Sequence, residues 1–309
     1  MQVPIVDFAL YNENDPATLT ALADEIDHVL SDVGFMSVIN LGIEWELVEK
    51  VFQASKDFFH SSDEVKKQSG YLSSKENFGY QKVGEENLDP DKPHDLKETF
   101  TMRNILNVGL EDGRWPSFEF QELMSEFFRE GMEAAYRIQR VLSAALGLDQ
   151  EFFVKYHGGE NVTFRLLHYP AFDPTIVQSG QLGAGAHTDY GLTTLLFQDP
   201  VGGLEVMDKD GNWVGVDYVE KAIVINCGDL LERWTNGKYR STPHRVQPKI
   251  AGAERFSMAL FVDPDTETPV HAIESCVSEN NPAKFPPVTA GEHILQKIEA
   301  THKQRFRPY

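Results

Sequence analysis

The sequence predicts a mainly β protein with flanking helices, and three observations lead to this prediction. After residue 161 the apolar residues come in short runs, and tight-turn pairs such as Asp210-Gly211 and Asn236-Gly237 separate these runs. No helical periodicity interrupts the series, which indicates an antiparallel sandwich or barrel. Before it, one amphipathic pattern spans residues 118–146 and predicts a single long helix.

The composition limits what the chain can bind. Its 309 residues allow one large domain or two modest ones, and the apolar fraction of 41% is ample for a core. The formal charge is −20, from 48 acidic against 28 basic side chains. Such a field repels phosphate backbones and anionic lipid surfaces, so neither a nucleic acid nor a membrane is expected as a partner.

Cysteine usage and the first residues of the chain indicate a cytoplasmic protein. Cys227 and Cys276 form no CxxC pair, which argues against a disulfide scaffold and against a thiolate zinc site. The chain does not start with a basic segment followed by an apolar one. No apolar run approaches the roughly 18 residues that a membrane-spanning helix needs. We therefore expect a soluble protein of a reducing compartment.

The N-terminal part alternates between strands and helices. Residues 4–8 predict a short strand, and an aspartate N-cap followed by proline starts a helix over residues 15–33. A strand over residues 35–40 and a helix over residues 45–59 follow. Residues 61–110 are polar and rich in charge, glycine and proline. A long irregular segment of this kind is typical of a functional loop or lid.

Short strands fill the chain up to residue 263, and a helix follows near its end. A capping box at Thr289–Glu292 starts that helix, which is expected to reach about Gln304. The strands that the apolar runs predict are 164–169, 187–198, 203–207, 213–217, 222–227, 238–247 and 255–263.

A histidine and a carboxylate two residues apart form the strongest candidate site. If His187 and Asp189 lie on one strand, as the following apolar run predicts, their side chains point to the same face. His244, 57 residues after His187, is the candidate third ligand. Two imidazoles and a carboxylate match the facial triad that binds ferrous iron, although the same ligands would tolerate zinc. Alternatively, either histidine is a structural residue hydrogen-bonded in the interior.

Two further groups share strand faces in a way that suits a bound carboxylate. Arg255 and Ser257 alternate on an apolar strand, and a guanidinium beside a hydroxyl can bind a carboxylate with several hydrogen bonds. Arg165 and Tyr169 also share a face, and the tyrosine hydroxyl could donate to the same ligand. A surface arginine and a tyrosine at the rim of a pocket are the simpler alternatives.

These residues together resemble a known family. The pattern His187-x-Asp189 … His244 with Arg255-x-Ser257 resembles the iron(II)/2-oxoglutarate-dependent dioxygenases, in the isopenicillin N synthase-like branch. The resemblance covers nearly the whole chain. The other segments that carry it are Pro4–Asp7, Gly34–Asn40, Asn226–Asp229, Trp234–Gly237 and Ser241–Val246.

The resemblance implies a double-stranded β-helix, or jelly roll, wrapped by helices. It implies a non-haem dioxygenase N-terminal region at 1–110, a long helix and connection at 111–160, the jelly-roll core at 161–265 and a helical extension at 266–309. Iron(II) would bind His187, Asp189 and His244. The far carboxylate of 2-oxoglutarate would pair with Arg255 and Ser257, with help from Tyr169.

Two positions depart from the family pattern. Plant members usually carry asparagine where this chain has Leu167, so one expected contact to the keto acid end of 2-oxoglutarate is missing. Leu41 replaces the histidine that is common in the Asn-His-Gly motif, which we interpret as a packing change.

The implied reaction uses dioxygen to convert 2-oxoglutarate to succinate and carbon dioxide while a small molecule is oxidised, most simply by hydroxylation. Arg165 and Arg103, if both line the pocket, would favour an anionic substrate. The candidate substrate residues are Arg165, Tyr190 and Phe261, together with Phe78, Tyr80 and Arg103 from the expected lid.

Three alternatives remain open from the sequence. Some relatives in the same branch close rings or form ethylene, and in ring-closing relatives the Arg-x-Ser pair can hold the substrate. A zinc hydrolase on a jelly roll and a jelly-roll binding module with a non-catalytic metal site belong to other classes. The sequence does not indicate the prime substrate or the oligomeric state.

Overall fold

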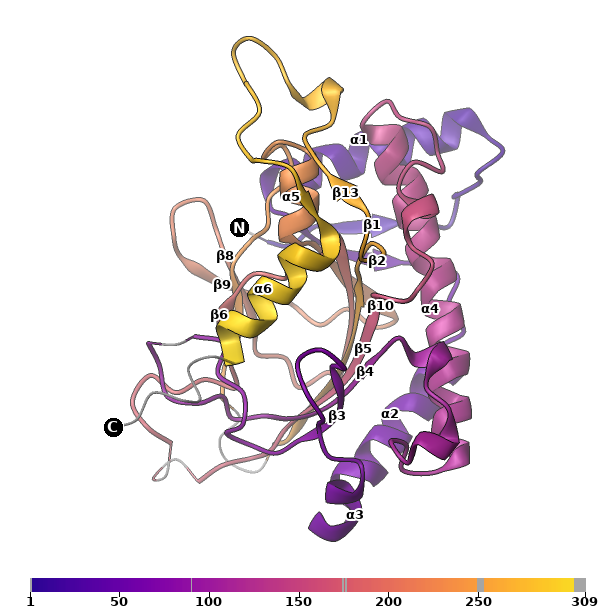
Figure 1. Ribbon diagram of the computed structural model, residues 1–309. Helices are drawn as coiled ribbons and strands as arrows, with labels where there is room; N and C mark the ends of the chain where they lie inside the picture. The colour runs from indigo at the N-terminus through magenta and orange to yellow at the C-terminus, as the bar shows by residue number, and fades with distance from the viewer. Residues whose placement is uncertain (1, 90, 174, 176, 249–252, 303–309) are drawn as a thin grey trace.

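Two β-sheets form the centre of the computed structural model, which describes residues 2–89, 91–173, 175, 177–248 and 253–302 (Figure 1). The strands are β1 (Ile5–Asp7), β2 (Phe35–Ile39), β3 (Phe78–Gln81), β4 (Glu98–Arg103), β5 (Thr163–Tyr169), β6 (Ala184–His187), β7 (Thr193–Gln198), β8 (Leu204–Met207), β9 (Trp213–Gly215), β10 (Ala222–Cys227), β11 (His244–Val246), β12 (Arg255–Val262), β13 (Pro269–Val270) and β14 (Val288–Thr289).

Helices occupy the connections between these strands. The α-helices are α1 (Pro16–Asp32), α2 (Trp45–Phe59), α3 (Asp63–Gln68), α4 (Phe118–Ala145), α5 (Asp229–Trp234) and α6 (Ala290–His302). The 3-10 helices are η1 (Ile105–Asn107), η2 (Leu110–Asp112), η3 (Val154–Tyr156) and η4 (Glu274–Cys276). In the described part of the chain, none of the helices is long and apolar enough to cross a membrane.

The larger sheet has eight strands in the order β1-β2-β10-β7-β12-β5-β4-β3, and only the β1–β2 pairing is parallel. The smaller sheet has the order β6-β11-β8-β9 and packs on the larger one. This arrangement confirms the prediction of a mainly β fold with a jelly-roll core and flanking helices. Strands β1 to β4 extend the sheet of the core, so the N-terminal region shares the core's hydrogen-bond network.

Helices α1, α2 and α4 lie along the outer side of the larger sheet, and the smaller sheet lies along its other side (Figure 1). Strand β12 is therefore buried on both faces. Its successive side chains point alternately toward the helices and toward the space between the sheets. Toward the helices it presents Phe256, Met258, Leu260 and Val262. Toward the space between the sheets it presents Arg255, Ser257, Ala259 and Phe261.

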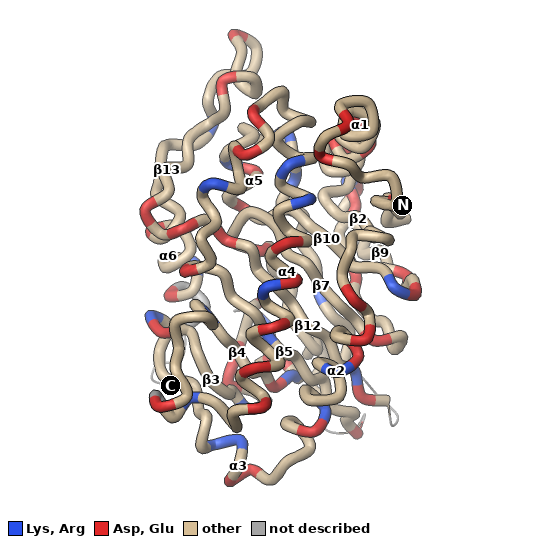
Figure 2. Tube along the Cα trace, turned by 90° about the vertical axis from the view of Figure 1, so that its right-hand side faces the viewer, with Lys and Arg blue, Asp and Glu red and all other residues tan. Residues whose placement is uncertain are grey.

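Acidic residues are scattered along the whole trace of the chain and are not gathered in one place (Figure 2). They alternate with basic ones along the outer side of α4, where both signs meet solvent. The charge of −20 is therefore spread over the surface, and no single region carries it.

The expected irregular segment at residues 61–110 contains two regular strands, so that expectation was wrong. Strand β4 pairs in register with β5 from Glu98↔His168 to Arg103↔Thr163. Its threonines, Thr99 and Thr101, are polar side chains that are buried between the sheets. Because a strand was predicted from apolar runs, these polar residues concealed it. The final helix is described up to His302, so its expected end at Gln304 lies outside the described residues.

Two predicted strands are also shorter or broken. The run 187–198 divides into β6 and β7, with a loop over residues 188–192 between them. The run 238–247 is strand only over β11.

Backbone hydrogen bonds hold the 188–192 loop against the start of α5. Gly228 N–H donates to Leu192 O at 2.9 Å, Asp229 N–H to Asp189 O at 2.8 Å and Leu230 N–H to Gly191 O at 3.0 Å. The N–H groups at a helix start are suited to this, because they have no partner inside the helix. A Cβ at Gly228 would lie 2.8 Å from the carbonyl carbon of Gly191. Glycine at 228 thus allows the close contact.

We expect Gly228→Ala to lower the free energy of unfolding by about 1–3 kcal/mol, because the added methyl group overpacks this contact. Displacement of the loop should also lower the metal content of the protein. Thermal unfolding and metal analysis would measure the two effects. Gly215→Ala is the control, since a Cβ there meets nothing within 4 Å. Equal behaviour of the two variants would contradict the role given to this contact.

Candidate active site

His187, Asp189 and His244 meet at one end of the space between the sheets. His187 ends β6, His244 begins β11, and the two residues are direct register partners. Asp189 Oδ1 lies 3.9 Å from His187 Nε2 and 3.7 Å from His244 Nε2. The possible ligand atoms of all three residues lie within 4.8 Å of one another. The structure thus forms the cluster that the spacing predicted.

The position of Asp189 differs from the prediction, because the residue lies in the 188–192 loop and not on a strand. Hydrogen bonds orient its carboxylate, and the alternation of side chains along a strand plays no part. Oδ2 accepts from Thr194 Oγ1 at 2.5 Å and from Asn226 Nδ2 at 2.7 Å. These bonds leave Oδ1 directed toward the two imidazoles.

Both histidines present a lone pair to the same point. His187 Nδ1 lies 2.7 Å from Gly185 O, and His244 Nδ1 lies 3.2 Å from Thr242 O. A carbonyl oxygen can only accept, so each Nδ1 carries the proton and each Nε2 is free to bind a cation.

The charge states also suit a divalent metal ion. Burial, and then the nearness of His244, lower the pKa of His187 to about 3, so this imidazole is neutral at pH 7. Burial alone would raise the pKa of Asp189, but the two histidines and the hydrogen bonds from Asn226 and Thr194 hold it below its usual range. The neutral His187 imidazole, the ionised Asp189 oxygen and a second imidazole from His244 form a ligand set that fits iron(II).

Arg255 is a buried cation in the same cavity. Its side chain is 1% exposed, Nη1 donates to Ser257 Oγ at 3.0 Å and Nη2 to Gln198 Oε1 at 3.4 Å. Its Cζ lies 4.8 Å from the centre of the Tyr169 ring. Among the residues that the structure describes, Nε has no hydrogen-bond partner, and both Nη atoms donate to uncharged groups and not to a carboxylate. A buried charge needs a partner, so this arrangement fits an anionic ligand.

The cavity lies between the two sheets and is covered in part by α6. Of the predicted substrate residues, the structure brings Arg165, Tyr190, Phe261 and Arg103 to its lining, together with the triad and with Arg255, Ser257 and Tyr169. These residues come from strands of both sheets and from the 188–192 loop.

Phe78 and Tyr80 do not line this cavity. They lie on β3, are 1% and 7% exposed, and pack with Phe58 and Phe100. Residues two apart on a strand share a face, and this face of β3 meets α2. The expectation of a lid containing them is corrected to an aromatic core.

Arg165 has its own counter-ion. Its Nη2 donates to Glu86 Oε1 at 2.8 Å, and Lys97 lies 3.1 Å from the other oxygen of Glu86. Lys97 also pairs with Asp95. Burial would raise the pKa of Glu86, but Arg165 and Lys97 lower it below its usual range, so the carboxylate is charged. The charged Glu86 carboxylate therefore neutralises Arg165, and Arg165 offers no free charge.

Other residues of the site were not identified from the sequence. Thr194 and Asn226 hold the Asp189 carboxylate, and nothing in one sequence connects them to it. Ile294 and Ile298 of α6 line the cavity. Their i, i+4 spacing was the available signal, since it places both on one helix face.

A jelly roll that encloses two imidazoles, a carboxylate and an arginine with only uncharged partners in the described part of the chain is typical of the non-haem iron oxygenases. Comparison with known families agrees. Residues 160–264 match the 2OG-Fe(II) oxygenase superfamily, and residues 3–130 match the family described as non-haem dioxygenase in morphine synthesis N-terminal. The chain belongs to the 2OG-Fe(II) oxygenase superfamily and is an oxidoreductase that depends on iron(II) and 2-oxoglutarate.

Individual relatives are similar over most of their length. The chain is 31% identical to the 2-oxoglutarate-Fe(II) type oxidoreductase hxnY of Emericella nidulans, over 98% of this chain and 90% of that protein. It is 31% identical to jasmonate-induced oxygenase 2 of Arabidopsis thaliana, over 95% and 78%. The crystal structure of a full-length Neurospora crassa protein in complex with alpha-KG and thymine superposes with a TM-score of 0.87, at 30% identity, over 97% of each chain.

We expect Thr194→Val to weaken iron binding by about 10–100-fold, because a hydrogen bond that orients a ligand carboxylate is lost. Thr193→Val is a matched control, since within the described residues the hydroxyl of Thr193 has no partner. Equilibrium dialysis against iron(II) without oxygen would give both affinities. An unchanged affinity in Thr194→Val would show that Asn226 alone holds the carboxylate.

Proposed function

We propose that this chain hydroxylates a small molecule, with iron(II) held by His187, Asp189 and His244 and the far carboxylate of 2-oxoglutarate held by Arg255 and Ser257. The observation that carries the proposal is Arg255, a fully buried guanidinium whose hydrogen-bond partners among the described residues, Ser257 and Gln198, are uncharged. A dicarboxylic acid can reach from the metal-binding triad to this arginine. One end would then bind at the triad, and the far carboxylate would neutralise the buried guanidinium.

The residues have separate roles in this proposal. Bound iron, with 2-oxoglutarate and dioxygen, supplies the oxidising chemistry. The imidazoles of His187 and His244 hold the metal ion together with Asp189, while Thr194 and Asn226 fix the carboxylate. The Tyr169 ring packs over the Arg255 guanidinium and keeps it directed into the cavity. Apolar side chains between the sheets exclude water, which limits side reactions.

We also propose that the chain belongs to the isopenicillin N synthase-like branch and acts in the cytoplasm. The Arg255-x-Ser257 pair and the Asn226–Asp229 run support the branch. Both cysteines are free thiols, and Cys227 is buried, which suits a reducing compartment. If the chain instead closes rings without 2-oxoglutarate, Arg255 would hold the substrate carboxylate.

Anaerobic titration of the iron-loaded protein with 2-oxoglutarate tests the cofactor assignment. We expect the visible absorption band of an iron-bound keto acid in the wild type. In Arg255→Gln we expect the dissociation constant to rise about 10–100-fold or more, since a hydrogen bond to a charged group contributes about 1.5–3 kcal/mol.

Arg114→Gln is the control for that titration, because Arg114 pairs with Glu76 outside the cavity. Iron that remains bound with no band at any 2-oxoglutarate concentration would contradict the proposal. It would favour a relative in which Arg255 binds the prime substrate.

We propose that the prime substrate carries an anionic or strong acceptor group that Arg103 binds. Arg103 lines the cavity and donates to the uncharged amide of Asn161. Burial raises the pKa of nearby Asp263 to about 7, so that acid neutralises Arg103 only in part. Arg165 is excluded from this role because Glu86 already pairs with it.

Arg103→Gln tests the proposed substrate contact. With a substrate from a panel of small carboxylates and neutral heterocycles, we expect KM to rise about 10–100-fold while kcat changes little, because the lost charged contact is made before and during reaction. The 2-oxoglutarate titration should remain unchanged. A wild-type preference for neutral heterocycles, with no effect of Arg103→Gln, would exclude the anionic substrate.

A further inference from the structure

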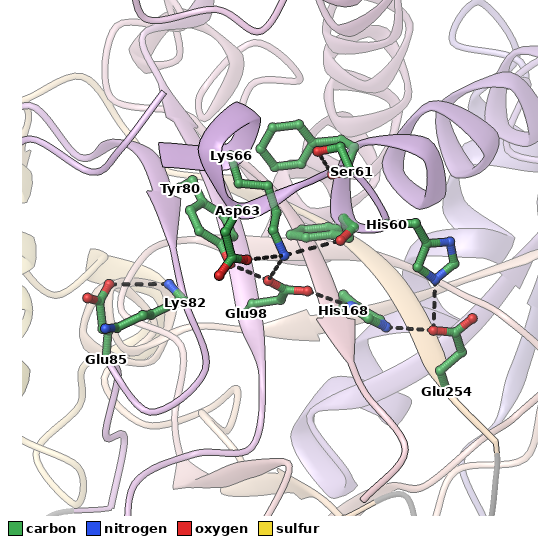
Figure 3. A network of polar contacts seen from close by, with 12 residues as sticks. His60, Ser61, Asp63, Lys66, Tyr80, Lys82, Glu85, Glu98, His168 and Glu254 are labelled. Atoms are coloured by element: carbon green, nitrogen blue, oxygen red, sulfur yellow. Dashed lines mark hydrogen bonds and ion pairs between the residues drawn. The ribbon is translucent and has the colours of Figure 1, made fainter. Parts of the chain in front are cut away.

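A second group of potential metal ligands lies on the outer side of the larger sheet (Figure 3). His60 follows the C-terminal end of α2, His168 lies on β5, and Glu254 directly precedes β12. Glu254 Oε2 lies 3.0 Å from His60 Nε2 and 2.9 Å from His168 Nε2. One carboxylate oxygen therefore meets two imidazole nitrogens, and the three residues come from different segments of the chain.

This group is separate from the active site. Tyr169 and Leu167 of β5 line the cavity between the sheets. His168 points to the opposite face, where its ring stacks on Phe256 with centroids 4.4 Å apart. The side chains of His60 and Glu254 are 52% and 41% exposed, so an ion can reach the group from solvent.

His168 has a carboxylate at each of its ring nitrogens. Nδ1 lies 2.8 Å from Glu98 Oε1, and Nε2 faces Glu254. Glu98 in turn accepts from Tyr80 and, at 3.1 Å, from Lys66 Nζ (Figure 3). A neutral imidazole has one N–H, so it can satisfy only one of two carboxylates. A cation bound at Nε2 would satisfy both carboxylates, because Nδ1–H could then donate to Glu98 while the cation joins Nε2 to Glu254.

We propose that His60, His168 and Glu254 form a second metal site, for a divalent transition metal ion of the zinc type. Two imidazole nitrogens and a carboxylate oxygen, with a position open to water, are a common zinc ligand set. In this arrangement Nδ1–H of His168 donates to Glu98, and Nε2 binds the metal ion.

The contact with Glu98 is the second observation that points to a metal ion. Histidines that bind metals usually donate their other N–H to a carboxylate, which fixes the ring and makes it a better ligand. Glu98 is itself held by Lys66 and Tyr80, so its position is set before any ion arrives. The metal ion would join the end of α2 to β5 and to the segment before β12, and it should stabilise the folded chain.

Zinc titration of the full-length, chelator-treated protein tests the site. We expect the wild type to bind two equivalents of Zn²⁺, one at each cluster, since the active-site ligands also tolerate zinc. His60→Ala and Glu254→Gln should each leave one equivalent, as should the His187→Ala/His244→Ala double variant. Adding His60→Ala to that double variant should abolish binding. His28→Ala, at a histidine on α1 away from both clusters, is the matched control and should keep both equivalents.

Thermal unfolding gives an independent readout that does not depend on activity. Zn²⁺ should raise the Tm of the His187→Ala/His244→Ala variant, and His60→Ala should remove that rise. A wild type that binds a single equivalent would overturn the proposal, as would a second equivalent that survives both His60→Ala and Glu254→Gln.

Discussion

The active site depends on how the Asp189 carboxylate is held. A metal ligand in a loop would lose orientation unless both its backbone and its side chain were fixed. Here the N–H of Asp229 binds the Asp189 carbonyl, while Thr194 and Asn226 bind one carboxylate oxygen. These contacts come from β7, β10 and the start of α5, so three elements must pack correctly before the third ligand exists. The two histidines need less support, because strand pairing between β6 and β11 already places them opposite each other.

Strand β12 connects the inside of the jelly roll to its outer surface. Its inward residues include Arg255 and Ser257, and its outward residue Phe256 stacks on His168. The proposed 2-oxoglutarate anchor on β12 and the proposed second metal site, whose Glu254 directly precedes β12, therefore lie on opposite faces of the larger sheet. Because neighbouring residues on a strand point in opposite directions, the two sites can be adjacent in sequence without competing for space.

The sequence predicted the parts of the site that local spacing determines. The jelly roll, the three ligands and the pairing of Arg255 with Ser257 all follow from period-two alternation, turn signals and the family resemblance that they carry. It did not predict the β3–β4 strands, because buried threonines made them look polar, or the neutralisation of Arg165. The partner of Arg165 is Glu86, 79 positions earlier, and no local pattern reports such a contact. The prediction that Asp189 lies on a strand was wrong although its place in the cluster was right, since tertiary hydrogen bonds replaced the strand geometry.

Two of the arginines that line the cavity, Arg255 and Arg165, explain how a chain of net charge −20 can bind an anion. Surface charges are screened within about 8 Å at physiological ionic strength, whereas charges inside a cavity are screened much less. The groups nearest the ligand therefore decide its binding. The negative charge of Glu86 neutralises the positive charge of Arg165, so this arginine is not available to bind an anion. Arg255 has only the neutral partners Ser257 and Gln198 among the described residues, so its desolvation is not offset within the protein. An incoming carboxylate provides that offset, and the position of the uncompensated arginine thus determines where the anion binds.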